Sequence, residues 1–164
     1  MSKIYFTADL HLGHKNIIVY SGRPYETAEE MDRALIKNWN SIVGPKDVVF
    51  IIGDFTYHSS TSWNSYEKLL LGHKVFLKGN HDKKQYAQIE YLGLNLNDKR
   101  YLLIHDSEDS FGKPDMVLCG HVHEKWLYKE YKDYYAVNVG VDQWKYRPIT
   151  LAQIEQRMSD ELEE

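Results

Sequence analysis

Short apolar runs alternate along the chain with segments in which apolar residues recur every three or four positions. Each short run predicts a β-strand, and the continuous apolar character of 47–52 is typical of a strand buried on both faces. From residue 101 onward we expect antiparallel pairing. The expected strands are 3–8, 47–52, 74–77, 101–104, 116–119 and a hairpin made of 126–131 and 134–139.

Four helices are expected between or after these strands. Thr27 and Glu30 form a capping box ahead of apolar residues at helical spacing, and Gly44-Pro45 ends that helix. Thr150 begins a C-terminal helix in the same way. Two further helices are expected over 62–71 and 83–92, whereas 10–26, with two glycines and a proline, predicts a long loop. This alternation of strands and helices predicts an α/β domain.

Length and charge narrow the possible functions. The 164 residues suffice for one domain, which we assign to 1–164. A formal net charge of −4 argues against binding of long nucleic acid, which needs a basic face. The longest apolar run, 48–52, is too short to span a membrane. The single cysteine and the absence of a recognisable signal peptide after Met1 predict a cytoplasmic protein.

Five of the apolar strands end abruptly in residue types that bind metal ions. Sites in α/β sheets form beyond the carboxyl ends of strands, so strands that finish together bring such groups to one place. Residues two apart in an extended segment face the same way, which pairs Asp9 with His11. The five strand ends are Asp9-Leu10-His11, Gly53-Asp54, Gly79-Asn80-His81-Asp82, His105-Asp106 and Gly120-His121-Val122-His123.

The candidate metal ligands combine oxygen with imidazole nitrogen donors: Asp9, His11, Asp54, Asn80, His105, His121 and His123. Seven ligands exceed the needs of one tetrahedral ion and suit two divalent ions that share a carboxylate. The mixed set favours manganese, zinc, iron or nickel over calcium, and manganese is the metal that we expect. Two such ions make the pocket net cationic, which lets an acidic protein attract phosphate. A purely structural role for these seven residues is a poor interpretation, because burying polar groups without partners costs folding free energy.

These five blocks, in this order, resemble those of the calcineurin-like metallophosphoesterases. Residues 9–16 and the Gly22-Arg23-Pro24 loop are also similar to small single-domain members from bacteria and phages. The resemblance implies two packed β-sheets flanked by helices, in a four-layer αββα sandwich. It also implies a division of the ligands: one ion held by Asp9, His11 and His123, the other by Asn80, His105 and His121, and Asp54 as the bridge. His81 is then the catalytic histidine, and Asp82 orients its ring.

We therefore expect a dinuclear phosphoesterase, and we favour a phosphodiesterase acting on a small phosphoester. Two metal ions supply a bridging hydroxide as nucleophile and neutralise the phosphoryl oxygens. His81, which is not needed as a ligand, protonates the leaving oxygen. The alternatives are a phosphomonoesterase acting on a nucleotide or phosphoprotein, and a non-catalytic binding scaffold on the same fold. Decay to a scaffold should remove ligands, but the whole set is present in this sequence.

The 10–26 loop supplies the candidate substrate-binding residues. Arg23 suits phosphate best, because its guanidinium is a planar fork of hydrogen-bond donors. His14 and Asn16 are further candidates for contacting the phosphate, and Lys15 could add a positive charge. The alternative is a solvated loop. The sequence departs from many members of this family shortly after Gly53-Asp54. Those members have an aspartate or arginine there, whereas this chain has Phe55-Thr56-Tyr57. We therefore expect the substrate contacts near this segment to differ.

The remaining polar and aromatic residues are expected to be structural. Asp106 should cap the loop after His105, and Cys119 should be a small core residue. The aromatic residues of the 126–139 hairpin are expected to pack, with stacking on a nucleobase as the alternative. We assign no chemistry to His58, His73, Asn138, Asp142 and Trp144.

Overall fold

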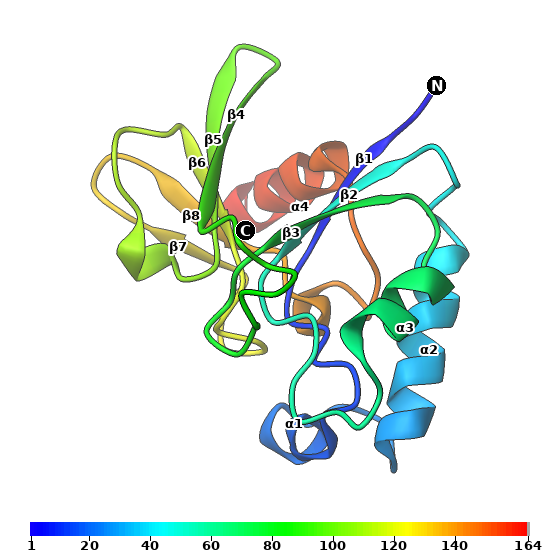
Figure 1. The fold of residues 1–164 in the computed structure, drawn as a ribbon. Coiled ribbons are helices and arrows are strands. Elements are labelled where there is room, and N and C mark those ends of the chain that lie inside the picture. Colours follow the sequence, from blue (N-terminus) through cyan, green and yellow to red (C-terminus); the bar gives the residue numbers. More distant parts are fainter. Residues whose placement is uncertain (164) are drawn as a thin grey trace.

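The computed structural model describes residues 1–163, which form two β-sheets packed against each other with helices on their flanks (Figure 1). The first sheet is parallel and has the strand order β1-β2-β3. Its strands match three of the expected apolar runs: β1 (Ile4–Thr7), β2 (Val48–Ile52) and β3 (His73–Leu77). No helix within these residues is long and apolar enough to cross a membrane.

Three helices cover one face of this first sheet: α1 (Lys15–Tyr20), α2 (Ala28–Asn40) and α3 (Trp63–Leu69). The cap predicted for α2 is confirmed, because Thr27 Oγ1 accepts a hydrogen bond from the Glu30 amide at 3.1 Å. The short helix α1 corrects the expectation of a continuous loop over 10–26. Ile17 and Ile18 account for it, because both are buried in the core beneath the helices.

The second sheet has the order β4-β5-β6-β8-β7. The expected antiparallel pairing is confirmed for β7 with β8, but it is wrong for the centre of the sheet, where β5, β6 and β8 are parallel. Strand β4, which was not expected, pairs antiparallel with β5. Segment 105–115 lies between β5 and β6, and segment 120–134, which includes β7, lies between β6 and β8. Both return the chain to the starting end of the neighbouring strand and so permit parallel pairing. The strands are β4 (Tyr91–Leu96), β5 (Lys99–Ile104), β6 (Met116–Cys119), β7 (Tyr128–Glu130) and β8 (Tyr135–Asn138).

The helix expected over 83–92 is wrong. Residues 84–86 form a turn, Ile89 makes an isolated bridge with Leu77, and β4 begins at Tyr91. The alternation of half-buried Leu92, Leu94 and Leu96 with exposed neighbours is the period-two pattern of a strand, and it outweighs the weak helical pattern before it.

The core between the sheets joins residues of both, such as Phe6 and Ile52 with Leu118 and Val137. Helix α4 (Leu151–Glu163) adds Ile154 to this core. Its predicted cap is confirmed by the bond from the Thr150 amide to Gln153, at 2.8 Å. On the other face of the second sheet, Trp126, Tyr131 and Tyr134 pack on buried aliphatic residues, as the packing interpretation predicted. Cys119 is fully buried there, and burial raises the pKa of its thiol.

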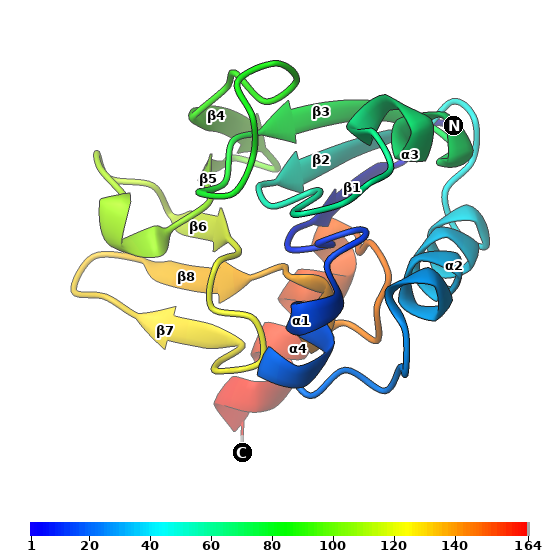
Figure 2. The ribbon, with the colours of Figure 1, turned by 60° about the horizontal axis from the view of Figure 1, so that its bottom comes forward.

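The arrangement of the two sheets positions the candidate site. In Figure 2 the carboxyl ends of β1 and β2 point toward the same central region as those of β6 and β8. Because five polar strand ends follow β1, β2, β3, β5 and β6, the fold brings side chains from both sheets to one place.

Candidate metal centre

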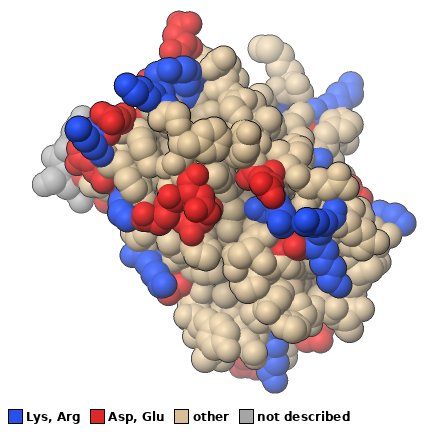
Figure 3. Space-filling view, turned by 60° about the vertical axis from the view of Figure 1, so that its left-hand side comes forward, with Lys and Arg blue, Asp and Glu red and all other residues tan. Residues whose placement is uncertain are grey.

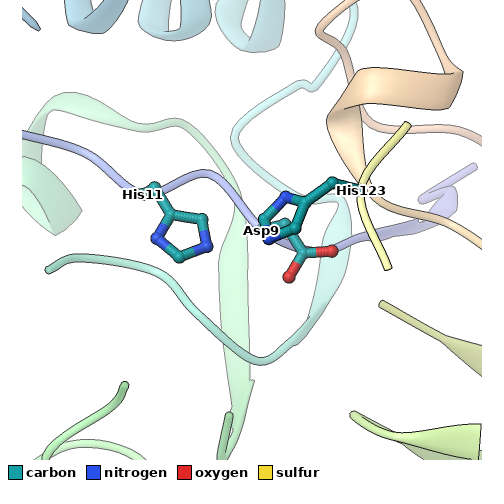
Figure 4. Close-up of side chains that lie close together, drawn as sticks. All are labelled: Asp9, His11 and His123. Carbon is teal, nitrogen blue, oxygen red and sulfur yellow. The ribbon is translucent and has the colours of Figure 1, made fainter. Parts of the chain in front are cut away.

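Two overlapping groups of potential metal ligands lie where the strand ends meet. Asp9, His11 and His123 each offer a ligand atom within 4.8 Å of the others, and so do Asp9, Asp54 and His105. Figure 4 shows the first group, with Asp9 and His11 on the segment after β1 and His123 on the loop after β6. Asp9 belongs to both groups, so the two clusters are contiguous.

Asp54 stands between two histidines from different sheets. Its Oδ2 lies 3.4 Å from His11 Nε2 and 3.4 Å from His105 Nε2. The carboxylate is almost fully buried, which by itself would raise its pKa. Hydrogen bonding and the charges of His105 and His11 outweigh burial and hold the pKa of Asp54 far below its usual range. Asp54 is therefore an ionised carboxylate placed to contact two sites at once.

Asn80 and His121 extend the cluster toward the surface. Asn80 Oδ1 lies 3.0 Å from His105 Nε2 and 3.3 Å from His121 Nδ1. The His121 side chain is more exposed than the other imidazoles, and its Nε2 is 3.6 Å from Asp106 Oδ2. The structure thus brings five of the expected ligands into two tight groups and places these two at the rim. Asp106 also caps the following turn through the Glu108 amide, as expected.

The backbone at the site is held in a conformation that most residues avoid. Five candidate ligands have φ in the left-handed region, with values between 50° and 72°: Asp9, His11, Asp54, His121 and His123. Such φ values are uncommon outside glycine, and they concentrate where function demands a particular side-chain direction. The strand ends turn sharply at these residues and so direct successive polar groups into the same space.

Two glycines allow the strand ends to approach closely. A Cβ atom on Gly79 would lie 2.2 Å from Asp54 Oδ1, and one on Gly53 would lie 2.2 Å from His105 Nδ1. Both contacts are far shorter than a methyl group tolerates, so a side chain at either position would displace a candidate ligand. This explains why glycine precedes the polar residues at these strand ends.

The hydrogen bonds of the histidines fit metal binding. Both ring nitrogens of His11 are buried without a hydrogen-bond partner, which is costly unless something else occupies them. His105 Nδ1 bonds the Ile52 carbonyl at 2.8 Å, which leaves Nε2 toward Asp54. A metal-ligating histidine usually donates one ring N–H to a carbonyl or carboxylate, which fixes the ring and leaves the other nitrogen for the ion. The donor set therefore suits divalent transition metals.

The charge state of His105 follows from the same neighbours. Burial disfavours the charged imidazole, but the Asp54 and Asp9 carboxylates favour it and raise the pKa of His105 to about 9. The carboxylates gathered at the site therefore favour positive charge beside them.

Arg23 corrects the expectation that it contacts substrate. The side chain is only 4% exposed. Its guanidinium forms a bidentate pair with Asp142, at 2.8 and 2.9 Å, and donates to the carbonyls of Leu10 and Asp9. These bonds direct the guanidinium away from solvent and toward the backbone that carries the candidate ligands Asp9 and His11. Arg23 is therefore a support beneath the site.

Asp142 is a functional residue that sequence reasoning missed. Its Oδ2 lies 3.3 Å from His123 Nδ1, which leaves His123 Nε2 for the cluster. Burial would raise the Asp142 pKa, but His123 and Arg23 lower it, so the carboxylate is ionised. The signal was present, because Gly140-Val141-Asp142 follows β8 closely and places a glycine and a carboxylate after an apolar strand.

Asp142→Asn is expected to weaken metal binding and to destabilise the fold. The change leaves the buried Arg23 cation with only a neutral partner, and breaking such a pair costs about 3 kcal/mol of unfolding free energy. It also loosens His123, and losing an outer partner of a ligand lowers metal affinity by about 10- to 100-fold. Urea unfolding in EDTA measures the first effect and metal titration the second. An unchanged metal affinity would contradict the role given to Asp142.

Asp82 also differs from expectation. Its carboxylate accepts hydrogen bonds from the backbone amides of Asp54, Phe55 and Gly79, at 2.7 to 3.0 Å, and from the Tyr86 hydroxyl at 2.5 Å. The His81 ring is not among its hydrogen-bond partners in residues 1–163. Asp82 therefore ties the loop after β2 to the loop after β3 and positions Asp54, instead of orienting His81.

His81 lies beside the cluster without belonging to it. Its Nε2 is 4.0 Å from Asp54 Oδ2, and its side chain is partly exposed. The Tyr57 ring packs against it with centroids 4.1 Å apart, a contact that the sequence did not reveal. Burial lowers the pKa of His81, while Asp54 opposes that shift. The imidazole is thus free of a fixed partner and close enough to contact a group bound at the cluster.

A cavity of about 550 Å³ opens beside His11, His81 and His123, and we call it the His14 cavity. His14 and Asn16 both line it, so the structure places these two predicted substrate residues next to the cluster. Burial and the nearby imidazoles lower the pKa of His14 to about 4, so it is neutral at neutral pH and available for hydrogen bonding. His58, expected to be structural, also lines this cavity, whereas His73 is exposed at the start of β3.

Some known proteins resemble this chain in sequence, and others resemble it in fold. The chain is 37% identical over 161 residues to the uncharacterized protein MJ1445 of Methanocaldococcus jannaschii, covering 92% of this chain and 88% of that one. It is 38% identical over 88 residues to the gene 66 protein of Mycobacterium phage L5, covering 50% of this chain and 41% of that one. The crystal structure of the Aquifex aeolicus protein AQ665, of unknown function, matches with a TM-score of 0.74 and 25% identity, covering 95% and 99%.

The family model of the calcineurin-like phosphoesterases matches residues 2–113. This range includes the polar ends of β1, β2, β3 and β5, and therefore most of the cluster. The resemblance inferred from the five blocks is confirmed, as is the fold of two sheets flanked by helices that it implied. The chain belongs to the calcineurin-like phosphoesterase family.

Proposed function

We propose that this protein is a phosphodiesterase that depends on two divalent metal ions. The observation that carries the proposal is the position of Asp54, whose one oxygen lies 3.4 Å from imidazole nitrogens of both His11 and His105. A carboxylate oxygen shared by two histidine-containing groups is what two neighbouring ions need as a bridge. The family membership adds that the chemistry is cleavage of phosphoesters.

The candidate ligands divide into two sets around Asp54. Asp9, His11 and His123 would hold one ion, in agreement with their grouping within 4.8 Å. The other ion would be held by His105, together with Asn80 and His121, which are linked through Asn80 Oδ1. Mixed nitrogen and oxygen donors favour manganese, with zinc, iron and nickel as alternatives. When bound, the two ions supply an activated water and positive charge for the phosphoryl oxygens.

The protein groups around the ions bind and protonate the substrate. His81 lines the His14 cavity and has no fixed hydrogen-bond partner for its ring, so it is placed to donate a proton to the leaving oxygen. His14 and Asn16 line the same cavity and would contact the leaving group. Asp82 and Asp142 hold Asp54 and His123 in place and do not contact the substrate.

Charge supports a diester over a monoester. A monoester dianion needs a further cation near the metal ions, and Arg23, the strongest candidate in the sequence, is buried against Asp142. On the face shown in Figure 3, basic side chains are interspersed with acidic ones, which suits a small substrate better than a long nucleic acid.

Two esters of one leaving group test the preference. We expect a higher kcat/KM for methyl p-nitrophenyl phosphate, a diester, than for p-nitrophenyl phosphate, a monoester, with the manganese-loaded protein. Nitrophenolate release at pH 7.5 measures both. Manganese should be replaceable by zinc, iron or nickel with altered rate, and EDTA should abolish the activity. A higher kcat/KM for the monoester would instead indicate a phosphomonoesterase, and no turnover with any metal would indicate a binding scaffold.

A further inference from the structure

A second cavity opens at the metal centre, beside the candidate ligands of the second ion. It has a volume of about 480 Å³, and we call it the Tyr91 cavity; its walls include Asn80, Tyr91, His105, Phe111 and His121. Three of these residues are the candidate ligands of the second ion, whereas the His14 cavity is lined by His11 and His123 of the first. The two cavities are therefore lined by different candidate ligands of the same cluster, and a phosphate bound there adjoins both.

The location of His81 distinguishes the two cavities. On the proposed function, water gives up a proton to solvent and adds its oxygen to phosphorus, and the P–O bond to the leaving group breaks. The leaving oxygen takes a proton from His81, which regains one from solvent. His81 lines the His14 cavity and a further cavity beside Tyr57 and Tyr86, but it does not line the Tyr91 cavity, so the leaving group lies on the His81 side of the metal centre and not in the Tyr91 cavity. The substituent that stays on phosphorus is then directed toward the Tyr91 cavity.

The Tyr91 cavity carries an aromatic pair that the rest of the fold does not explain. Tyr91 and Phe111 contact each other edge to face, with ring centroids 4.6 Å apart, yet they are 53% and 50% exposed. Half-exposed aromatic rings at the wall of a cavity present apolar surface to whatever enters it. A flat ring bound there would stack on one of them and remove that surface from water.

The charges of the same cavity limit what the flat ring can carry. Glu90, Asp106 and Asp109 line it against one cation, Lys78, and Lys78 Nζ lies 3.9 Å from Glu90. This excess of carboxylates repels additional phosphates or carboxylates on the substrate. A planar, uncharged group meets no such repulsion.

Resting on the proposed function, we infer that the Tyr91 cavity binds the retained substituent of the diester, and that this substituent is a nucleoside with an uncharged base. The base stacks on Tyr91 and Phe111, and the phosphate remains at the metal centre. The leaving alcohol lies on the His81 side of the metal centre.

Two diesters with the same leaving group test this assignment by kinetics. The manganese-loaded protein is given thymidine 5′-(p-nitrophenyl phosphate) and ethyl p-nitrophenyl phosphate, and the ratio of their kcat/KM values is measured from nitrophenolate release. We expect Phe111→Ala to lower this ratio about fivefold, the usual scale of one aromatic stacking contact. Tyr91→Ala should lower it similarly, and Leu69→Ala, an exposed apolar position outside both cavities, should leave the ratio as it is.

Binding without turnover separates the inference from the proposed function. Calorimetry gives the Kd of thymidine 5′-monophosphate and of methyl phosphate for the same proteins. We expect Phe111→Ala to weaken only the nucleotide, again about fivefold. If the protein cleaved neither diester, the proposed function would fail, and this measurement would still decide the subsite.

Two results would overturn the inference. One is an equal effect of Phe111→Ala on nucleoside and simple alkyl ligands, which would make the ring structural. The other is loss of the nucleoside preference in Tyr20→Ala, a residue of the His14 cavity, which would place the base on the leaving-group side.

Discussion

Asp54→Ala is expected to lower phosphoesterase activity about a thousandfold or more, the scale on which removal of key electrostatic groups acts. Asp54 Oδ2 lies 3.4 Å from His11 Nε2 and 3.4 Å from His105 Nε2. On the proposed division of the ligands, this change removes a donor from both ions, whereas a change at another ligand removes a donor from one. Asp54→Ala also leaves two buried imidazoles without the anion that favours a cation between them.

Metal content and activity together measure this effect. We expect Asp54→Ala to bind both ions more weakly than the unaltered protein, by equilibrium dialysis against manganese. Asp133→Ala, an exposed carboxylate in the turn between β7 and β8, is the matched control and should keep both metal content and rate. If Asp54→Ala retained both ions with unaltered affinity, Asp54 would not be the bridge.

His81→Ala is expected to keep both metal ions and to lose rate about a hundredfold or more on unactivated diesters, as is typical for general acid catalysis. His81 lies 4.0 Å from Asp54 yet outside the groups of ligand atoms that could hold an ion. Its loss therefore removes a proton donor without removing a ligand. An alkoxide is a poor leaving group and needs that proton, while a nitrophenolate departs without it, so the defect should be smallest on nitrophenyl esters.

Kinetics on an alkyl and a nitrophenyl diester, each with measured metal content, test this pattern. His73→Ala, an exposed histidine at the other end of β3, serves as the control and should leave both rates intact. An equal loss on both esters with metals retained would point to phosphate binding by His81. Loss of a metal would place His81 among the ligands.

The candidate metal ligands were predictable because their signal is local. An apolar run that stops at a histidine, asparagine or carboxylate places that side chain at the end of a strand, and strand ends meet in this fold. Asp9, His11, Asp54, His105 and His123 were found in this way, and the structure brings their ligand atoms together. The same rule applied to Gly140-Val141-Asp142 would have found the partner of His123.

The supporting contacts were not predictable, because they join residues far apart in the sequence. Arg23 and Asp142 are 119 positions apart, and no local pattern indicates that the Arg23 guanidinium is buried against the Asp142 carboxylate. Asp82 follows His81 directly, but its hydrogen bonds go to the backbone of Asp54, 28 positions earlier. Side chains with several possible partners are assigned by packing, which only the folded structure shows.

The number of metal ions bound per chain tests the central claim most directly. The metal-free protein is reconstituted with excess manganese, freed of unbound metal by gel filtration and analysed by inductively coupled plasma mass spectrometry, and its diesterase activity is followed as manganese is added back. We expect two ions per chain at saturation, and activity that appears only as the second ion binds. One ion or none at saturation in a fully active protein would contradict the dinuclear site.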